Sequence, residues 1–176
     1  LKVMYYQDFI RLVEGNPTTR MLSKSKTQQT GNISADRGSD EKDNRAKRKG
    51  LEKDLKKKGI GYKKGVGEYK YKSDDGKEGT GREVTYQTSP KKGMSKRRFG
   101  KVMRRLGRKH GQESVITKDK DKPARLHDTQ SKKPSKSVNL GKSNPGKNPK
   151  GEGETSGTKI RSGKLPKTNK KAYHYN

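Results

Sequence analysis

Apolar positions along the chain follow a helical period in two separate segments. In residues 4–14 the apolar side chains recur with helical spacing and leave the polar ones on the opposite face. Gly15 and Pro17 follow directly, and both residue types end helices. The pattern predicts a short amphipathic helix over residues 4–14, then a polar linker over residues 15–32. The apolar positions are Tyr5, Tyr6, Phe9, Ile10, Leu12 and Val13.

The most regular helical pattern starts near Ser95 and runs to about residue 111. Its apolar positions recur three and four residues apart, at Phe99, Val102, Met103, Leu106 and His110. An earlier helix is predicted after Ser39, which can cap it, and before Gly59, which ends it. Its acidic first turn suits the positive end of the helix dipole. Only Leu51 and Leu55 would point inward from it.

Alternation of apolar and polar residues predicts strands between and after these helices. Residues 60–72 and 82–89 are expected to pair around a Gly-rich loop at 73–81. Gly65 and Gly67 suggest a bulge in the first of these strands. Residues 113–117 form a short buried strand, and residues 124–129 add an edge segment.

The order of elements predicts an α+β fold, a helix-strand-strand-helix-strand domain over residues 33–129 with its helices on one face of the sheet. Residues 130–176 contain twelve Lys and Arg against two Glu, with Gly, Pro, Ser and Asn throughout. This composition predicts a disordered basic tail.

The net charge of the chain indicates what kind of molecule it binds. The 176 residues include 47 Lys and Arg against 19 Asp and Glu, a formal net charge of +28, and only 22% are hydrophobic. Such an excess favours a polyanion as partner, and nucleic acid, most simply double-stranded DNA, is the obvious one. A merely solvated surface is the alternative.

The sequence argues against several kinds of functional site. The chain has no Cys, and its three His are far apart, so no zinc or Cys/His catalytic site is expected. No cofactor, metal or catalytic residue is predicted. No segment approaches the roughly 18 apolar residues of a membrane span, so no membrane partner is expected.

The opening helix has three open interpretations: a terminal helix packed on the domain, a partner-binding segment, or a removable targeting helix. Residues 6–10 and 12–15 resemble the capsid-targeting sequence of internal head proteins in large contractile-tailed bacteriophages. The resemblance implies a docking face of Tyr6, Phe9, Ile10 and Val13, and protease cleavage after Glu14 in the site Leu12, Glu14, Gly15. It also implies the phage scaffold core or capsid and the prohead protease as partners. The location would be the capsid interior, after assembly in the host cytoplasm.

The middle region, through residues 43–70 and 111–116, resembles an uncharacterised family of small bacterial and phage domains. That likeness implies fold and phage context but no reaction. Gln112 is a candidate for hydrogen bonding to a ligand, with a structural role at the start of its strand as the alternative.

The helix near residue 100 is also strongly basic on its outer side. A helix of this kind can lie along phosphates, with Arg giving bidentate contacts and Lys giving point charges. Tyr62, Tyr69, Tyr71 and Tyr86 are expected in the core, with base stacking as the alternative. The candidate nucleic-acid-binding residues are Lys96, Arg97, Arg98, Lys101, Arg104, Arg105, Arg108 and Lys109.

The sequence alone thus favours a non-enzymatic internal head protein of a phage that binds DNA by neutralising phosphates. One rival is a Mg²⁺-dependent nuclease, since Glu68 and Lys70 form an acidic-x-Lys triplet on a predicted strand. Another is a protein that is injected into the host and binds an acidic partner there.

Overall fold

The structure is a computed structural model that describes residues 17–131, 136–145, 155–157 and 172–175. Three helices are described, α2 (Pro17–Thr27), α3 (Glu41–Lys57) and α4 (Lys96–Lys109). The strands are β1 (Thr30–Ser34), β2 (Ile60–Lys72), β3 (Glu78–Pro90), β4 (Ser114–Lys118), β5 (Ala124–Asp128), β6 (Ser137–Gly141), β7 (Ser143–Pro145), β8 (Thr155–Gly157) and β9 (Ala172–Tyr175).

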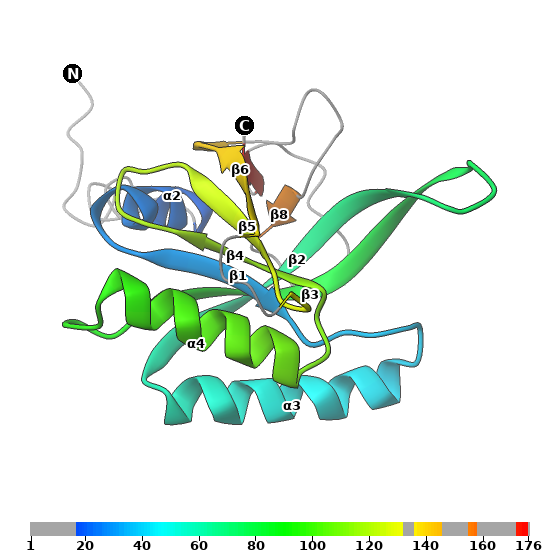
Figure 1. The fold of residues 1–176 in the computed structure, drawn as a ribbon, viewed down its shortest axis with the longest axis horizontal. Coiled ribbons are helices and arrows are strands. Elements are labelled where there is room, and N and C mark those ends of the chain that lie inside the picture. Colours follow the sequence, from blue (N-terminus) through cyan, green and yellow to red (C-terminus); the bar gives the residue numbers. More distant parts are fainter. Residues whose placement is uncertain (1–16, 132–135, 146–154, 158–171, 176) are drawn as a thin grey trace, which may run out of the picture.

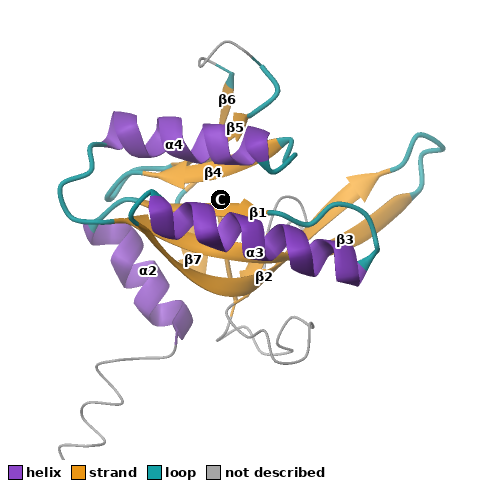
Figure 2. Ribbon diagram, turned by 90° about the horizontal axis from the view of Figure 1, so that it is seen from below, coloured by secondary structure: helices purple, strands orange, loops and turns teal. Residues whose placement is uncertain are grey.

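All described strands join one antiparallel sheet in the order β6-β5-β4-β1-β3-β2-β8-β9-β7. Helices α3 and α4 lie side by side on one face of it, while α2, β6 and β8 lie on the other side (Figures 1 and 2). β9 is four strands away from β1 in the sheet order, yet its Tyr173 and Tyr175 hydroxyls reach Asn32 of β1. The sheet therefore curls back over its own face.

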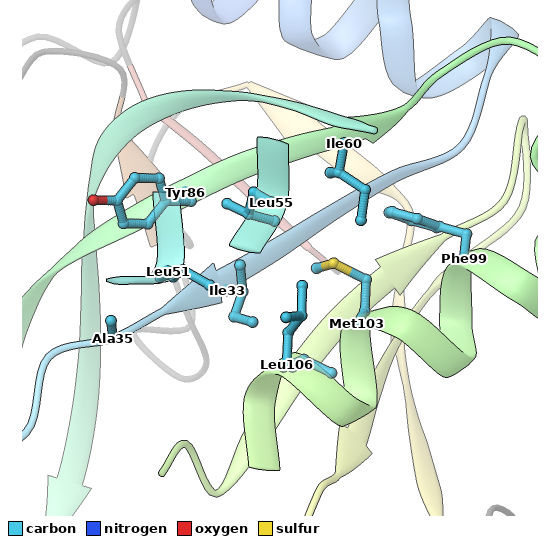
Figure 3. Packing of buried hydrophobic residues seen from close by; sticks show 10 residues of the cluster. Ile33, Ala35, Leu51, Leu55, Ile60, Tyr86, Phe99, Met103 and Leu106 are labelled. Atoms are coloured by element: carbon cyan, nitrogen blue, oxygen red, sulfur yellow. The ribbon is translucent and has the colours of Figure 1, made fainter. Parts of the chain in front are cut away.

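The hydrophobic core fills the space between the sheet and the helix pair (Figure 3). Helix α4 contributes residues three and four apart along one face, which is the spacing that packs against a sheet. Tyr86 is fully buried in this core, and its ring meets the Tyr62 ring edge to face at 5.3 Å. The cluster comprises Ile33, Ala35, Leu51, Leu55, Ile60, Tyr86, Phe99, Met103, Leu106 and Val115.

The α+β class and the order helix, strand, strand, helix, strand are confirmed by α3, β2, β3, α4 and β4. Ser95 caps α4, accepting a hydrogen bond from Arg98 N at 3.2 Å. The cap of α3 is Asp40 and not Ser39, because the Asp40 carboxylate accepts from Lys42 N at 2.9 Å. The expected bulge at Gly65 and Gly67 was wrong, since β2 and β3 pair residue for residue along their whole length.

The predicted linker over residues 15–32 was also wrong, because α2 and the start of β1 occupy most of it. Lys118 fixes the end of α2: its buried ammonium donates to Ser25 O at 2.7 Å. Within residues 130–176, the described residues lie largely in β6 to β9, so the sheet extends further along the chain than expected. The predicted helix at residues 4–14 lies outside the described residues.

Among the described residues, no helix is long and apolar enough to cross a membrane.

Candidate functional site

The two faces of the central strands have opposite character. Successive side chains of a strand alternate between faces. Ile33 and Tyr86 belong to the core under the helices, so their neighbours Asn32 and Gln87 point to the other face. On that face the strand register aligns four residues in one row, Leu126, Ile116, Asn32 and Gln87, across β5, β4, β1 and β3. The row passes from two apolar side chains to two amides.

A cleft of about 940 Å³ opens on this second face. Its inner part is formed by strand residues, and its rim is formed by Glu83 of β3, Arg108 of α4, the segment after β1 and the segment between α4 and β4. The inner lining includes Asn32, Ser34, Thr85, Ile116, Leu126 and Leu140, and the rim includes Asp36, Arg37, Glu83, Arg108, Gln112 and Glu113. The size is within the usual range of small-ligand sites.

The rim is held by a connected set of hydrogen bonds. Asp36 accepts from both Arg48 and the backbone N–H of Val84, the latter at 2.9 Å. Gln112 donates from Nε2 to Asp36 O at 3.1 Å, which joins the segment before β4 to the segment after β1. Thr129 in turn donates its hydroxyl to Gln112 O. These bonds position the rim before any ligand arrives.

Arg48 stays charged in this setting. Its hydrogen bonds to Asp36, assisted by Glu41, raise the pKa of Arg48 above its usual range despite partial burial. The Asp36 carboxylate is therefore paired with Arg48, and its role at the rim is structural. The carboxylates of Glu83 and Glu113 and the guanidinium groups of Arg37 and Arg108 are the other charges of the cleft lining.

The inner part holds one polar atom without a hydrogen-bond partner among the described residues, Thr85 Oγ1. Both amide atoms of Gln87, on the same face of β3 but outside the cleft lining, also have no partner there. Thr85 is 1% exposed and Gln87 is 3% exposed. Buried polar groups in folded proteins are nearly always hydrogen-bonded. Thr85 Oγ1 is therefore a group that could form a hydrogen bond with a molecule in the cleft.

The residues predicted to bind nucleic acid lie along α4, and only Arg108 among them reaches the cleft, with Nε donating to Thr129 O at 2.9 Å. Lys109 pairs with Asp54 at 2.8 Å and Lys96 with Asp119 at 3.5 Å. The structure brings Arg98, Lys101 and Arg105 together in a separate basic groove of about 450 Å³ against the end of α3 and Lys91. The predicted docking and cleavage residues of the first 15 positions lie outside the described part of the chain.

Gln112 has the structural role that was the alternative to ligand binding, since its amide holds the rim, although it also lines the cleft. Tyr62 and Tyr86 are core residues as expected, whereas the Tyr69 and Tyr71 side chains are not described. No group of three or more His, Asp or Glu in the described ranges is placed to hold a metal ion.

The fold is of the α+β class, and its antiparallel sheet curls over a cleft with an uncharged inner wall and a charged rim. This is the architecture of a small-ligand-binding protein. The sequence model of the S-adenosylmethionine lyase family matches residues 31–171, which is most of the chain, and the protein belongs to this family. No curated protein matches the chain. Among solved structures, a phage SAM lyase in complex with S-methyl-5′-thioadenosine is similar to it, with 17% identity and a TM-score of 0.36. The similarity covers 64% of this chain and 88% of that chain.

Family membership overturns the functional interpretation of the sequence. The prediction of an internal head protein was wrong, because the matched range covers nearly all of the region assigned to a basic DNA-binding domain and tail. The predictions of a non-enzymatic protein and of a nuclease as its rival were wrong for the same reason. The net charge of +28 had been interpreted as a sign of function, although charge alone specifies no reaction.

Sequence reasoning missed Asn32, Thr85 and the two rim carboxylates Glu83 and Glu113. A signal was present in residues 82–89, where polar residues alternate with Val84 and Tyr86. That alternation was interpreted as one buried face and one solvated face. In a strand at the centre of a sheet, polar residues on the second face are instead candidates for a ligand site.

Proposed function

We propose that this protein cleaves S-adenosylmethionine without water, at the bond between the sulfonium sulfur and Cγ of the methionyl chain, and releases S-methyl-5′-thioadenosine. The observation that carries this proposal is the family match, whose range contains every residue that lines the cleft. The cleft adds support because its volume suits a nucleoside-sized ligand.

The sulfonium group makes such a cleavage chemically accessible, because sulfur leaves as a neutral thioether. The carboxylate of the substrate can reach Cγ by closing a five-membered ring. A C–O bond then forms as the C–S bond breaks, and the electron pair of the broken bond moves to sulfur. The products are the thioether and a lactone, and the balance needs no proton, water or cofactor.

The protein has two tasks in this reaction, to fold the substrate onto itself and to keep water away from Cγ. Ile116, Leu126 and Leu140 supply apolar walls of the cleft. Glu83 and Glu113 offer negative charge to the sulfonium and ammonium groups, and Arg37 offers positive charge that orients the carboxylate.

The test is to incubate the purified full chain with S-adenosylmethionine and to quantify S-methyl-5′-thioadenosine by liquid chromatography and mass spectrometry. A sample without protein corrects for spontaneous breakdown of the substrate. We expect release of the thioether in proportion to protein concentration and time. A rate equal to that of the protein-free sample would contradict the proposal.

Isotope labelling separates cleavage without water from hydrolysis. In H₂¹⁸O, direct attack of water on Cγ would place ¹⁸O in the side-chain hydroxyl of homoserine. Ring closure followed by opening of the lactone at its carbonyl places the label in the carboxyl group. We expect the second pattern, and label in the hydroxyl would identify a hydrolase.

A further inference from the structure

Arg37 is the rim cation whose charge has no partner in the described part of the chain. It is exposed and lines the cleft. Among the described residues its guanidinium forms no hydrogen bond and no ion pair, and only its backbone N–H is bonded, to Asn44 Oδ1 at 2.8 Å. Arg108, the other cation of the lining, already donates from Nε to Thr129 O. An anion in the cleft therefore finds its available partner in Arg37.

The backbone that carries Arg37 is fixed on both sides. Asn44, which is buried on α3, accepts from Arg37 N and donates from Nδ2 to Gly38 O at 3.1 Å. Gln112 Nε2 donates to Asp36 O, also at 3.1 Å. The segment after β1 is thereby tied to α3 on one side and to the segment before β4 on the other. The base of the Arg37 side chain consequently has a set position at the rim.

The Arg37 side chain lies directly against the backbone of Gly111. A Cβ at Gly111 would be 2.9 Å from Arg37 Cδ and 3.0 Å from Arg37 Cζ, and it would be closer still to Nη1. Carbon atoms pack at about 3.5 to 4.0 Å, so any side chain at this position would force the guanidinium to move. Gly111 also has a φ of +67°, which favours glycine for a separate reason.

We infer that Gly111 is a positioning residue, whose lack of a side chain lets the Arg37 guanidinium lie where it pairs with the carboxylate of the substrate. A guanidinium and a carboxylate form two parallel hydrogen bonds, which fix orientation as well as supplying charge. This carboxylate is also the nucleophile of the proposed ring closure, so its placement relative to Cγ controls the rate. The inference rests on the proposed function, because the carboxylate is taken to belong to S-adenosylmethionine.

The experiment compares two ligands that lack the sulfonium group and are therefore not cleaved. S-adenosylhomocysteine carries the carboxylate and the ammonium group, whereas S-methyl-5′-thioadenosine carries neither. Calorimetry with the full chain measures both affinities. Gly111→Ala should bind S-adenosylhomocysteine about tenfold or more weakly than the wild type does, and its affinity for S-methyl-5′-thioadenosine should change less than about threefold, because only the first ligand loses a charged pair. Arg37→Met should give the same pattern.

Two further variants separate the contact with Arg37 from the backbone conformation. In Gly76→Ala, in the loop between β2 and β3, the new Cβ would sit at a φ of +82° and meet no atom of the described residues within 4 Å beyond its chain neighbours. This variant carries the conformational strain alone, and it should bind both ligands as the wild type does. Gly111→Asn keeps the Cβ but tolerates a positive φ better than alanine, so it should show the same selective loss, and it serves as the test if Gly111→Ala does not fold.

A double variant shows whether Gly111 acts through Arg37. In the Arg37→Met background, Gly111→Ala should cause no further loss of affinity for S-adenosylhomocysteine, because the group that it displaces is already absent. Additive losses overturn the inference, as does wild-type affinity for this ligand in either single variant. Equal weakening of both ligands, which a merely structural role would produce, also overturns it, and so does a wild type that binds neither. A wild type that shows the selective losses but does not cleave S-adenosylmethionine would instead overturn the proposed function, so the two failures are distinguishable.

Discussion

The guanidinium of Arg48 donates two hydrogen bonds to the carboxylate of Asp36, from Nε at 2.6 Å and from Nη2 at 2.7 Å. Their side chains are only 15% and 10% exposed. The pair joins α3 to the segment after β1, and it therefore connects the helix layer with the rim of the cleft. Removing one member leaves the other nearly buried without its counter-charge.

Arg48→Met should consequently lower the free energy of unfolding by about 2 to 3 kcal/mol, since breaking a buried pair strands the remaining charge. Urea denaturation of the wild type and the variant at neutral pH measures this difference in the free energy of unfolding. Lys47→Met breaks the exposed pair of Lys47 with Asp43 and serves as the control, with an expected loss of at most about 1 kcal/mol. Equal losses in the two variants would show that Asp36 and Arg48 do not act as a buried pair.

His127 should make stability depend on pH. Burial, with Arg104 and Arg125 nearby, lowers the pKa of His127 to about 4. An unfolded His titrates near 6.5, so between pH 6.5 and 4 the unfolded chain binds a proton that the folded chain does not. Its contribution to stability is therefore present above pH 6.5 and lost as the pH falls toward 4, by about 3 kcal/mol in all.

The measurement compares unfolding free energies of the wild type and His127→Gln at intervals from pH 7.5 to 4. Glutamine does not titrate and retains an amide that can meet Thr117, whose hydroxyl lies 2.6 Å from His127 Nε2. The difference between the two proteins should change steadily over this range. Parallel curves would assign the acid sensitivity to other groups.

Two glycines in helices should respond oppositely to alanine. A Cβ at Gly107 of α4 would lie 2.7 Å from Val115 Cγ1 and Thr129 Cγ2, so Gly107→Ala should destabilise by about 1 to 3 kcal/mol. A Cβ at Gly50 of α3 would meet only His110 Cε1, at 3.7 Å. Gly50→Ala should stabilise by up to about 1 kcal/mol through helix propensity. Thermal unfolding of the two variants checks both signs, and stabilisation by Gly107→Ala would mean that α4 does not pack on β4 as closely as described.

Glu83→Gln should distinguish the charged rim from the uncharged row. If the methionyl group lies at the rim, loss of this charge should reduce kcat/KM for S-adenosylmethionine roughly ten- to hundredfold, the usual value of a hydrogen bond to a charged group. Binding of S-methyl-5′-thioadenosine, which has neither the sulfonium nor the ammonium charge, should change less than about threefold. Glu78→Gln, at an exposed position at the start of β3, is the control for surface charge. A similar loss for both ligands would place Glu83 elsewhere than beside the cation.

Local pattern predicted the helix layer well. Phe99, Met103 and Leu106 lie on one face of any helix formed by their segment, and Ser95 precedes it with the right side chain for a cap. The pairing of β2 with β3 could also be predicted from the sequence, because a short Gly-rich loop joins two segments with the alternation of a strand. In each case the residues that interact are close in sequence.

The functional interpretation failed where it relied on bulk charge. Lys and Arg are distributed through the whole chain, and most of those on α4 lie outside the cleft. The residues that line the cleft are uncharged at its inner end and come from segments with no motif in common. Composition therefore could not locate them.

The sequence by itself determined α3 and α4, the cap of α4, the buried faces of both helices and the central hairpin, because nearest-neighbour stereochemistry and short-range hydrophobic spacing suffice for these. Only the tertiary structure decided that the polar stretch around Asn32 is a central strand and not a linker. The reason is that its burial comes from Tyr173 and Tyr175, about 140 residues away, and from strands on both sides. The cleft has the same origin, since a polar strand face becomes a ligand site only when distant strands pair beside it and the sheet curls over it.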